Sequence, residues 1–181
     1  KNSPRLKRFL NEVKEGLVPI TLWLREDVGD TQEGVREFNF LINDAKFDNP
    51  KPTKLIQLML QLTTSNSTND IVLDFFAGSG TTGDSLLNHN YKDHGNRKFI
   101  LIQLPEMISK EDNNFNQNFI TISDISQERL RQKIISLKDE NKQQKLNAKQ
   151  NQDLGFKVFK LVKSNYKVWQ DIQDETKLKE Q

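Results

Sequence analysis

The fold is decided by one stretch of the sequence, Ile71-Val72-Leu73-Asp74-Phe75-Phe76-Ala77-Gly78-Ser79-Gly80-Thr81-Thr82. Its first three residues are apolar and favour a β-strand. Asp74 ends this run, the small residues around Gly78 and Gly80 form a turn, and Thr81 begins a segment that can be helical. The stretch therefore predicts a strand, a tight glycine turn and the N-terminus of a helix.

The predicted turn has the properties of a ligand site. Glycine has no Cβ, so a ligand can reach the backbone of the turn. The following helix offers free N–H groups and a partial positive charge, and Asp74 adds a negative charge at the same place. A ligand with both a carboxylate and an ammonium group, such as the methionine end of S-adenosylmethionine (SAM), suits this pair of charges. A G-x-G pattern alone is equally typical of a tight turn without a ligand.

Composition limits the classes of protein that this chain can belong to. The 181 residues are enough for one domain with a core. The chain has no cysteine and two histidines, which excludes disulfides and thiolate metal sites and disfavours a histidine-rich one. No apolar run reaches the roughly 18 residues that span a bilayer, and no signal peptide is visible, so we expect a cytoplasmic protein. The net charge of +2 means that any DNA contact must use local basic patches.

Three helices and one strand are predicted before the glycine turn. Residues 3–16 have apolar side chains at helical spacing, and their basic face is either solvated or a DNA-phosphate patch. Residues 18–24 predict a strand, and Pro19 indicates an edge strand or a strand start. Thr31 is expected to cap a helix that bears Val35, Phe38 and Leu41 or Ile42. Two prolines then start a third helix, whose buried stripe is predicted to contain Leu55, Leu58, Met59 and Leu62.

A helix and a second strand are predicted after the turn. Residues 81–90 favour a helix, and residues 98–104 favour a buried strand parallel to the first one. These elements form a βαβ unit, which should be right-handed. Ligands of such α/β sheets bind beyond the C-terminal ends of the strands. Gln103 and Glu106 lie at that end, where either can accept a hydrogen bond from ribose hydroxyls, and the sequence leaves the choice open.

The C-terminal third is more polar. Residues 105–118 resemble a mobile flap, and a long helix is expected from Ser123 or Asp124 to residue 137. That helix has a predicted basic strip formed by Arg129, Arg131 and Lys133. Residues 138–153 predict a flexible linker or a frayed helix extension. Residues 154–161 predict a final strand, with a lysine and aromatic stripe for DNA as the alternative, and residues 171–181 form a charged tail.

Several segments together resemble one family. The string from Asp74 to Thr82 resembles the cofactor motif of permuted amino-group DNA methyltransferases. The chain as a whole looks like the C-terminal part of the modification (Mod) subunit of type III restriction-modification systems. The segments that carry this resemblance are 47–55, 74–82, 95–106, Ser123-Asp124-Ile125 with Glu128-Arg129, and 155–161 with Ser164-Asn165. Lys51 alone is typical of a rigid helix start with a solvent-facing lysine, but in this context it matches the methyltransferase pattern.

The resemblance implies a fold and an activity. The fold would be α/β, the cofactor-binding half of a Rossmann-like SAM-dependent methyltransferase, with a mixed sheet and flanking helices. The activity would be SAM-dependent methylation of adenine N6 in double-stranded DNA, with the base flipped out of the helix. The implied partners are double-stranded DNA, a restriction (Res) subunit and a second Mod subunit. The implied cofactor-binding residues are Lys51, Pro52, Asp74, Phe75, Ala77, Gly78, Ser79, Gly80, Thr81, Gln103 and Glu106.

The same resemblance divides the chain. Residues 1–46 would lead in from an upstream target-recognition region, and residues 47–137 would be the SAM-binding core. Residues 138–153 would be a linker, and residues 154–181 would be the terminal strand region and tail.

One expected motif is absent from the sequence. Enzymes of this type hold the target amino group with an Asp/Asn-Pro-Pro-Tyr/Phe tetrapeptide, which positions the nitrogen for attack without a covalent step. The 181 residues contain no such tetrapeptide, and the motif is expected upstream of Lys1. We therefore predict that this chain contains no catalytic residue and is inactive in methyl transfer on its own. The alternative is a non-catalytic module that assembles a restriction complex or binds DNA phosphates.

Overall fold

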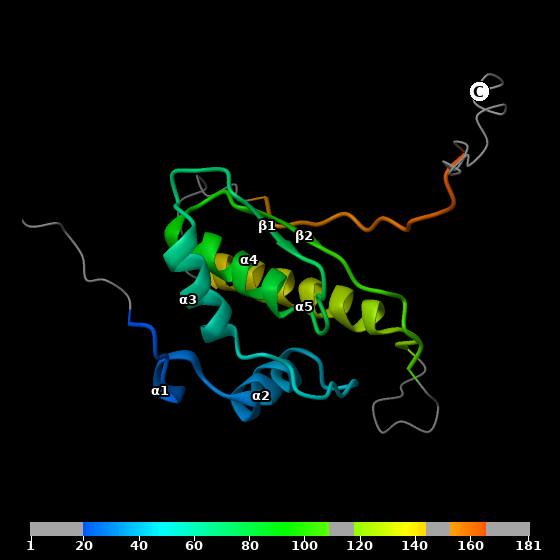
Figure 1. Cartoon of the computed structure of the whole chain (residues 1–181), viewed down its shortest axis with the longest axis horizontal. Helices are drawn as coiled ribbons and strands as arrows, with labels where there is room; N and C mark the ends of the chain where they lie inside the picture. The colour runs from blue at the N-terminus through cyan, green and yellow to red at the C-terminus, as the bar shows by residue number, and fades with distance from the viewer. Residues whose placement is uncertain (1–19, 109–117, 144–152, 166–181) are drawn as a thin grey trace, which may run out of the picture.

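A computed structural model of the chain describes residues 20–108, 118–143 and 153–165. Its elements follow one another as α1 (Arg25–Val28), α2 (Thr31–Leu41), α3 (Thr53–Thr63), β1 (Ile71–Asp74), α4 (Thr81–Asp93), β2 (Lys98–Leu101) and α5 (Ile122–Gln143). The described part is therefore α/β, with helices α4 and α5 packed together beside a small sheet (Figure 1).

The sheet consists of β1 and β2. The two strands are parallel, with Leu73 opposite Ile100 and Asp74 opposite Leu101. Helix α4 connects them, so the predicted βαβ order is confirmed. Strand β2 ends at Leu101, three residues earlier than predicted, although the Ile102 N–H still donates to the Asp74 carbonyl at 2.8 Å.

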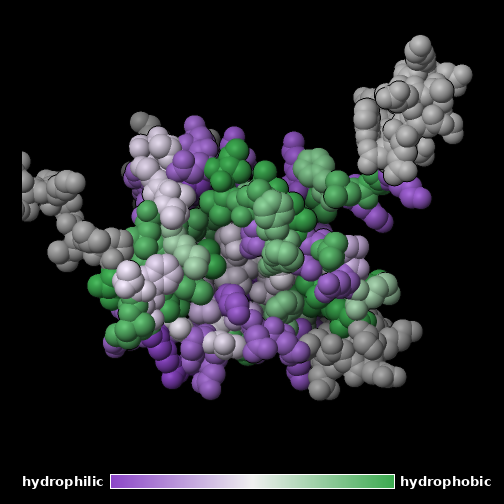
Figure 2. All heavy atoms as spheres, viewed as in Figure 1, coloured by the Kyte–Doolittle hydropathy of each residue, from purple (hydrophilic) through white to green (hydrophobic). Residues whose placement is uncertain are grey.

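The two faces of this sheet differ in burial. Phe99 and Leu101 pack against a buried cluster from α4 and α5, which consists of Leu87, Leu130, Ile134 and Leu137. The alternate positions face the other way and are exposed, namely Ile71, Leu73, Ile100 and Ile102. Hydrophobic side chains gather over this part of the surface (Figure 2). The prediction of a buried second strand is therefore wrong for Ile100 and Ile102, because only one face of the sheet is covered in this structure.

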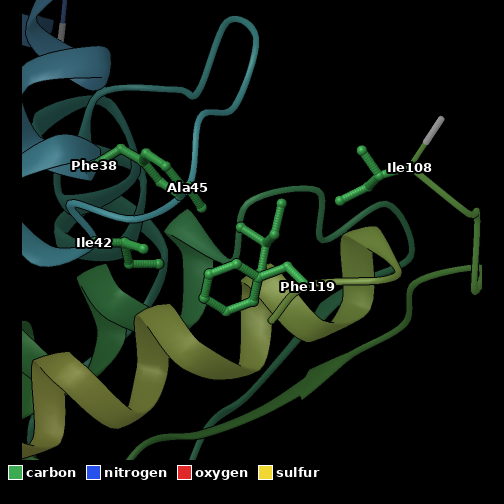
Figure 3. Close-up of a cluster of buried hydrophobic side chains, with 6 residues drawn as sticks. Phe38, Ile42, Ala45, Ile108 and Phe119 are labelled. Carbon is green, nitrogen blue, oxygen red and sulfur yellow. The ribbon is translucent and has the colours of Figure 1, made fainter. Parts of the chain in front are cut away.

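A second core lies between α2 and α5. It consists of Phe38, Ile42, Ala45, Ile108, Phe119 and Ile125 (Figure 3). The side chain of Phe38 is fully buried. These contacts join residues on both sides of the predicted boundary at residue 46.

Two helices begin slightly earlier than predicted, α2 by one residue and α5 by one or two. The N-cap of α2 is Asp30, whose carboxylate accepts from the Glu33 N–H at 2.8 Å, and Thr31 is the first helical residue. Helix α5 begins at Ile122. Asp124 accepts from the Thr121 N–H at 2.8 Å at this end. Helix α5 continues to Gln143, so the first residues of the predicted linker are helical, and residues 144–152 lie outside the described part.

The predicted stripe of α3 is wrong at two positions. Met59 and Leu62 are exposed, whereas Leu60 is buried. The reason is tertiary, because α3 packs mainly against α4, and that contact selects the face that carries Leu60.

Two predicted strands are absent from the described residues. Residues 20–24 are not a strand, and Ile20 and Leu22 are exposed. Residues 154–161 also lack strand structure, although the side chains of Leu154 and Phe156 pack against the α4–α5 cluster. A β-type pattern needs a partner strand, and neither segment has one in the described part. The helix predicted at 3–16, most of the predicted flap and the charged tail lie outside the described residues.

The basic strip predicted on α5 is also wrong. Arg129 is fully buried, and Lys133 lies 3.8 Å from Asp84. Arg131 is half-exposed and forms an ion pair with Glu128 at 3.3 Å. Arg129 and Lys133 are four positions apart and share the face toward Asp84, whereas Arg131 lies two positions from each and points to the other side of the helix.

Candidate cofactor site at the glycine turn

The glycine turn has the backbone that the sequence predicts. Gly78 and Gly80 have φ angles of 52° and 79°, in the left-handed region that other residues rarely adopt. The Gly80 N–H donates to the Ala77 carbonyl at 2.8 Å, and the Asp84 N–H donates to the Gly80 carbonyl at 3.1 Å. Gly80 is the N-cap of α4, and no side chain caps this end. The first N–H groups of α4 therefore have no acceptor within the helix.

A pocket of about 240 Å³ lies at this turn. Six of the predicted cofactor residues line it: Lys51, Asp74, Ala77, Gly78, Ser79 and Thr81. Six further residues complete the lining: Phe47, Asn49, Pro50, Ile56, Phe76 and Thr82. Sequence reasoning missed this second set as site residues, although three of them fall in the segment 47–55 that carries the family resemblance.

Asp74 is held in place at the C-terminal end of β1. One carboxylate oxygen accepts from the Phe76 N–H at 3.0 Å, and the other accepts from the Thr82 hydroxyl at 2.6 Å. A carboxylate offers about four acceptor positions, so Asp74 retains acceptor capacity toward the pocket. The side chain is half-buried, which strengthens its attraction for a cation relative to open water.

The remaining predicted residues lie around the pocket, not in its lining. The Gly78 N–H donates to Gln103 Oε1 at 2.8 Å, so Gln103 supports the turn. Glu106 is exposed, and its backbone carbonyl accepts from the Ile122 N–H at 3.1 Å. Phe75 is also exposed, while Pro52 and Gly80 are buried behind the pocket. Of the two ribose candidates, only Gln103 contacts the turn.

Pro50 and Lys51 form the opposite wall of the pocket, and α2 fixes the position of this segment. A Cβ on Gly34 would lie 2.2 Å from the Pro50 carbonyl oxygen, so only glycine permits this close contact. Glu37 of α2 then accepts from both the Thr53 N–H and the Thr53 hydroxyl at 2.8 Å, which caps α3. Helix α2 thus sets the position of the wall that carries Lys51.

Arg129 is the main residue that sequence reasoning misplaced. From α5 its guanidinium donates to the hydroxyls of Ser79 and Thr81, at 3.1 and 2.8 Å. The Ser126 hydroxyl, one turn earlier, donates to the Gly78 carbonyl. One signal could have found Arg129: it follows Ile125 by four positions and thus falls on the buried face of the helix.

The described residues contain neither a group of three or more potential metal ligands nor a helix long and apolar enough to cross a membrane. The pocket at the glycine turn has a volume of about 240 Å³. Its volume is below the roughly 300–1,000 Å³ of a site that encloses a whole drug-sized molecule. A carboxylate and an uncapped helix N-terminus on its lining fit the zwitterionic end of an amino acid, so this end of SAM matches the residues present.

The chain belongs to the DNA methylase family, whose model matches residues 7–133. The resemblance to type III Mod subunits is confirmed. The chain is 32% identical over 147 residues to the Mod subunit of the type III restriction-modification enzyme StyLTI of Salmonella typhimurium. It is 34% identical to the EcoPI Mod subunit of Escherichia phage P1 and 34% identical to the EcoP15I Mod subunit of Escherichia coli.

The matches cover most of this chain but little of each relative. They include 81%, 63% and 64% of this chain, in the order given above, and 21%, 17% and 16% of the relatives. The chain thus spans about a fifth of the length of the curated relatives that it matches.

Proposed function

We propose that this chain is the SAM-binding half of a site-specific DNA methyltransferase that acts on adenine N6 in double-stranded DNA. The observation that carries the proposal is the pocket between Asp74 and the N-terminus of α4. Similarity to Mod subunits supports a place in a type III restriction-modification system. The partners would then be double-stranded DNA, a Res subunit and a second Mod subunit.

We infer that the whole protein has the Rossmann-like fold of SAM-dependent methyltransferases. The β1–α4–β2 unit supports this inference, since its ligand pocket lies at the C-terminal end of a parallel strand. The exposed face of the sheet also supports it, because parallel sheets are normally covered on both faces. Further strands and helices would complete the mixed sheet in the longer protein.

In the proposed binding mode, Asp74 accepts hydrogen bonds from the ammonium group of SAM. The N–H groups at the start of α4 face its carboxylate. The Lys51 segment packs against the methionine end, and Phe47, Pro50 and Phe76 supply apolar surface. Gln103 orients the turn through Gly78, and this contact favours Gln103 over Glu106 as the residue that binds the ribose.

SAM supplies a methyl group on a positively charged sulfur when it is bound. The residues of this chain orient that donor, and they include no group that holds the target amine. The Asp/Asn-Pro-Pro-Tyr/Phe tetrapeptide of such enzymes is absent from the 181 residues. We therefore expect no transfer of labelled methyl to DNA by this chain alone, and transfer would contradict the division into a cofactor half and a catalytic half.

The proposed site is tested by calorimetric titration of SAM into the wild-type chain and into D74N. Asparagine can still accept from the Phe76 N–H and can donate to the Thr82 hydroxyl, so D74N removes the charge while keeping the local hydrogen bonds. We expect saturable binding to the wild type and binding at least about tenfold weaker in D74N, since hydrogen bonds to a charged group are worth about 1.5–3 kcal/mol.

The matched control is D70N. Asp70 precedes β1 at the end opposite the pocket and contacts Thr68 and Ser65. D70N should bind SAM like the wild type. Methylthioadenosine, which lacks the amino-acid end, should bind equally well to wild type and D74N. Equal SAM affinity in D74N and wild type would contradict the proposed binding mode.

A further inference from the structure

The glycine turn is held from behind by Arg129, a charged residue that does not line the pocket. Its side chain is fully buried in α5. The Nη1 atom donates to the Ser79 hydroxyl at 3.1 Å and to the Thr81 hydroxyl at 2.8 Å. Both hydroxyl residues line the pocket. Arg129 therefore contacts the pocket wall from the side that is away from the ligand.

The other edge of the guanidinium is anchored to α4. Nε and Nη2 each lie 2.9 Å from Asp84 Oδ2, and Asp84 is itself buried. The ring of Phe38 lies 5.9 Å from the guanidinium carbon. A planar guanidinium that is fixed along one edge has little freedom at the other. The ion pair with Asp84 thus determines where Nη1 points, and Nη1 in turn determines the positions of the two hydroxyls.

The contact extends across the pocket to its second wall. The Thr81 hydroxyl, which accepts from Arg129, donates to the Lys51 carbonyl at 3.3 Å. It also lies 3.1 Å from the Ser79 hydroxyl. Donation by Arg129 occupies an acceptor position of the Thr81 oxygen and leaves its hydroxyl proton for a neighbouring acceptor. One buried cation therefore links the glycine turn to the Lys51 segment.

We propose that Arg129 is a positioning residue for the cofactor, one that sets the spacing between the glycine turn and the Lys51 wall. The proposal rests on the proposed function, because it concerns the same pocket. Under this proposal Arg129 contributes to SAM affinity although it does not line the pocket, and this contribution is separate from its contribution to stability. A displacement of about 1 Å in such a wall can weaken a site substantially.

The test compares R129K with R97K. Lysine keeps the charge of arginine but replaces the planar fork with a single ammonium, so it cannot hold Asp84 and both hydroxyls at once. Arg97 is a matched control, since it is also buried and its Nη2 lies 2.8 Å from Asp93 at the other end of α4. Arg97 is not part of the pocket lining. Both variants should lose thermal stability.

Two measurements distinguish a positioning role of Arg129 from a role in stability alone. At a temperature where all variants are folded, R129K should raise the Kd for SAM by at least about tenfold, and R97K should leave it unchanged. Without any ligand, R129K should speed hydrogen exchange at the amides of residues 77–82, whereas R97K should speed it only near residues 93–98.

A double-mutant cycle with T81V tests whether Arg129 affects SAM affinity through the Thr81 hydroxyl. Valine keeps the shape of Thr81 and removes its hydroxyl, so the effect of R129K on SAM affinity should become smaller in the T81V background. An undiminished effect would show that Arg129 acts by another route and would overturn the proposal. Wild-type affinity in R129K would also overturn it and would leave the proposed function standing. Failure of the folded wild-type chain to bind SAM would instead overturn the proposed function itself.

Discussion

Gly80 lies where the turn meets α5. Its φ is 79°, and a Cβ at this position would lie 3.1 Å from the Ser126 carbonyl oxygen. An L-residue in the left-handed region costs roughly 1–2 kcal/mol. The backbone conformation and the neighbouring helix therefore both require glycine here, and the turn and α5 are fixed together.

We expect G80A to lower the free energy of unfolding by about 1–2 kcal/mol or more, for this reason. The measurement is urea denaturation. G155A is the control, because the nearest atom to a Cβ there is a side-chain oxygen at 3.5 Å, and it should change stability little. Equal stability of G80A and wild type would contradict the observed turn.

His89 gives the chain a dependence on pH. Burial lowers the pKa of His89 below its ordinary value of 6.5, while Asp93 opposes this effect and Arg97 and Lys92 add to it. Burial raises the pKa of Asp93, but the hydrogen bond from Arg97 and other contacts outweigh burial and leave that pKa below its ordinary value. The folded chain therefore binds a proton at His89 less readily than the unfolded chain does.

We expect the free energy of unfolding to fall as the pH falls below 6.5. The contribution of His89 is complete above this value, and it is lost progressively as the pH approaches the lower pKa of the folded state. Urea denaturation at about pH 7.5 and about pH 5.5 measures this loss. In H89Q the difference between the two pH values should be smaller, and an equal difference would assign the effect to other groups.

At the scale of elements, the start of α3 depends on a carboxylate from another helix. Pro52 is the N-cap of α3 and provides no side-chain hydrogen bond. Glu37 of α2 provides the missing cap instead, because its carboxylate accepts from both the N–H and the hydroxyl of Thr53. This contact fixes α3 relative to α2 and thereby the segment between them, which carries Lys51.

E37A should therefore destabilise the chain by about 1 kcal/mol, the typical cost of a lost N-cap. E33A is the matched control on the same helix. It removes an ion pair with Lys54 in which the Lys54 side chain is 50% exposed and the Glu33 side chain 31%, and surface pairs contribute about 0–1 kcal/mol. Chemical denaturation of both variants provides the comparison, and a larger loss in E33A than in E37A would count against the capping role.

At the scale of the whole molecule, the sheet has one open face. Ile71, Leu73, Ile100 and Ile102 are exposed on it. Water-exposed apolar patches of this kind drive association. We expect the isolated chain to self-associate weakly as its concentration rises.

The double variant L73T/I100T should reduce this association, because threonine keeps the strand propensity and removes apolar surface. Sedimentation velocity over a range of concentrations measures it. I135T is the control, since Ile135 is as exposed as Ile100, at 50%, but lies on α5. Concentration-independent sedimentation of the wild type would contradict the prediction.

The sequence by itself determined the elements of the β1–α4–β2 unit and the order in which they occur. The run from Ile71 to Thr82 specified a strand, a glycine turn and a helix because these residues favour those conformations without help from distant parts of the chain. The location of Asp74 at the end of the strand and of Gly78 and Gly80 in the turn followed from this pattern. The same residues carry the family resemblance.

Tertiary structure alone decided which faces are buried and which groups meet. Periodicity could not show that α3 would bury Leu60, since the partner helix selects the face. Propensity could not exclude strands at 20–24 and 154–161, because pairing depends on a neighbour that is distant in sequence. The sequence placed Arg129 in an exposed basic strip, because its environment depends on residues that are distant in sequence. Packing of α5 against the glycine turn brings its guanidinium to Ser79, Thr81 and Asp84. There the ion pair with Asp84 offsets the cost of burying the charge.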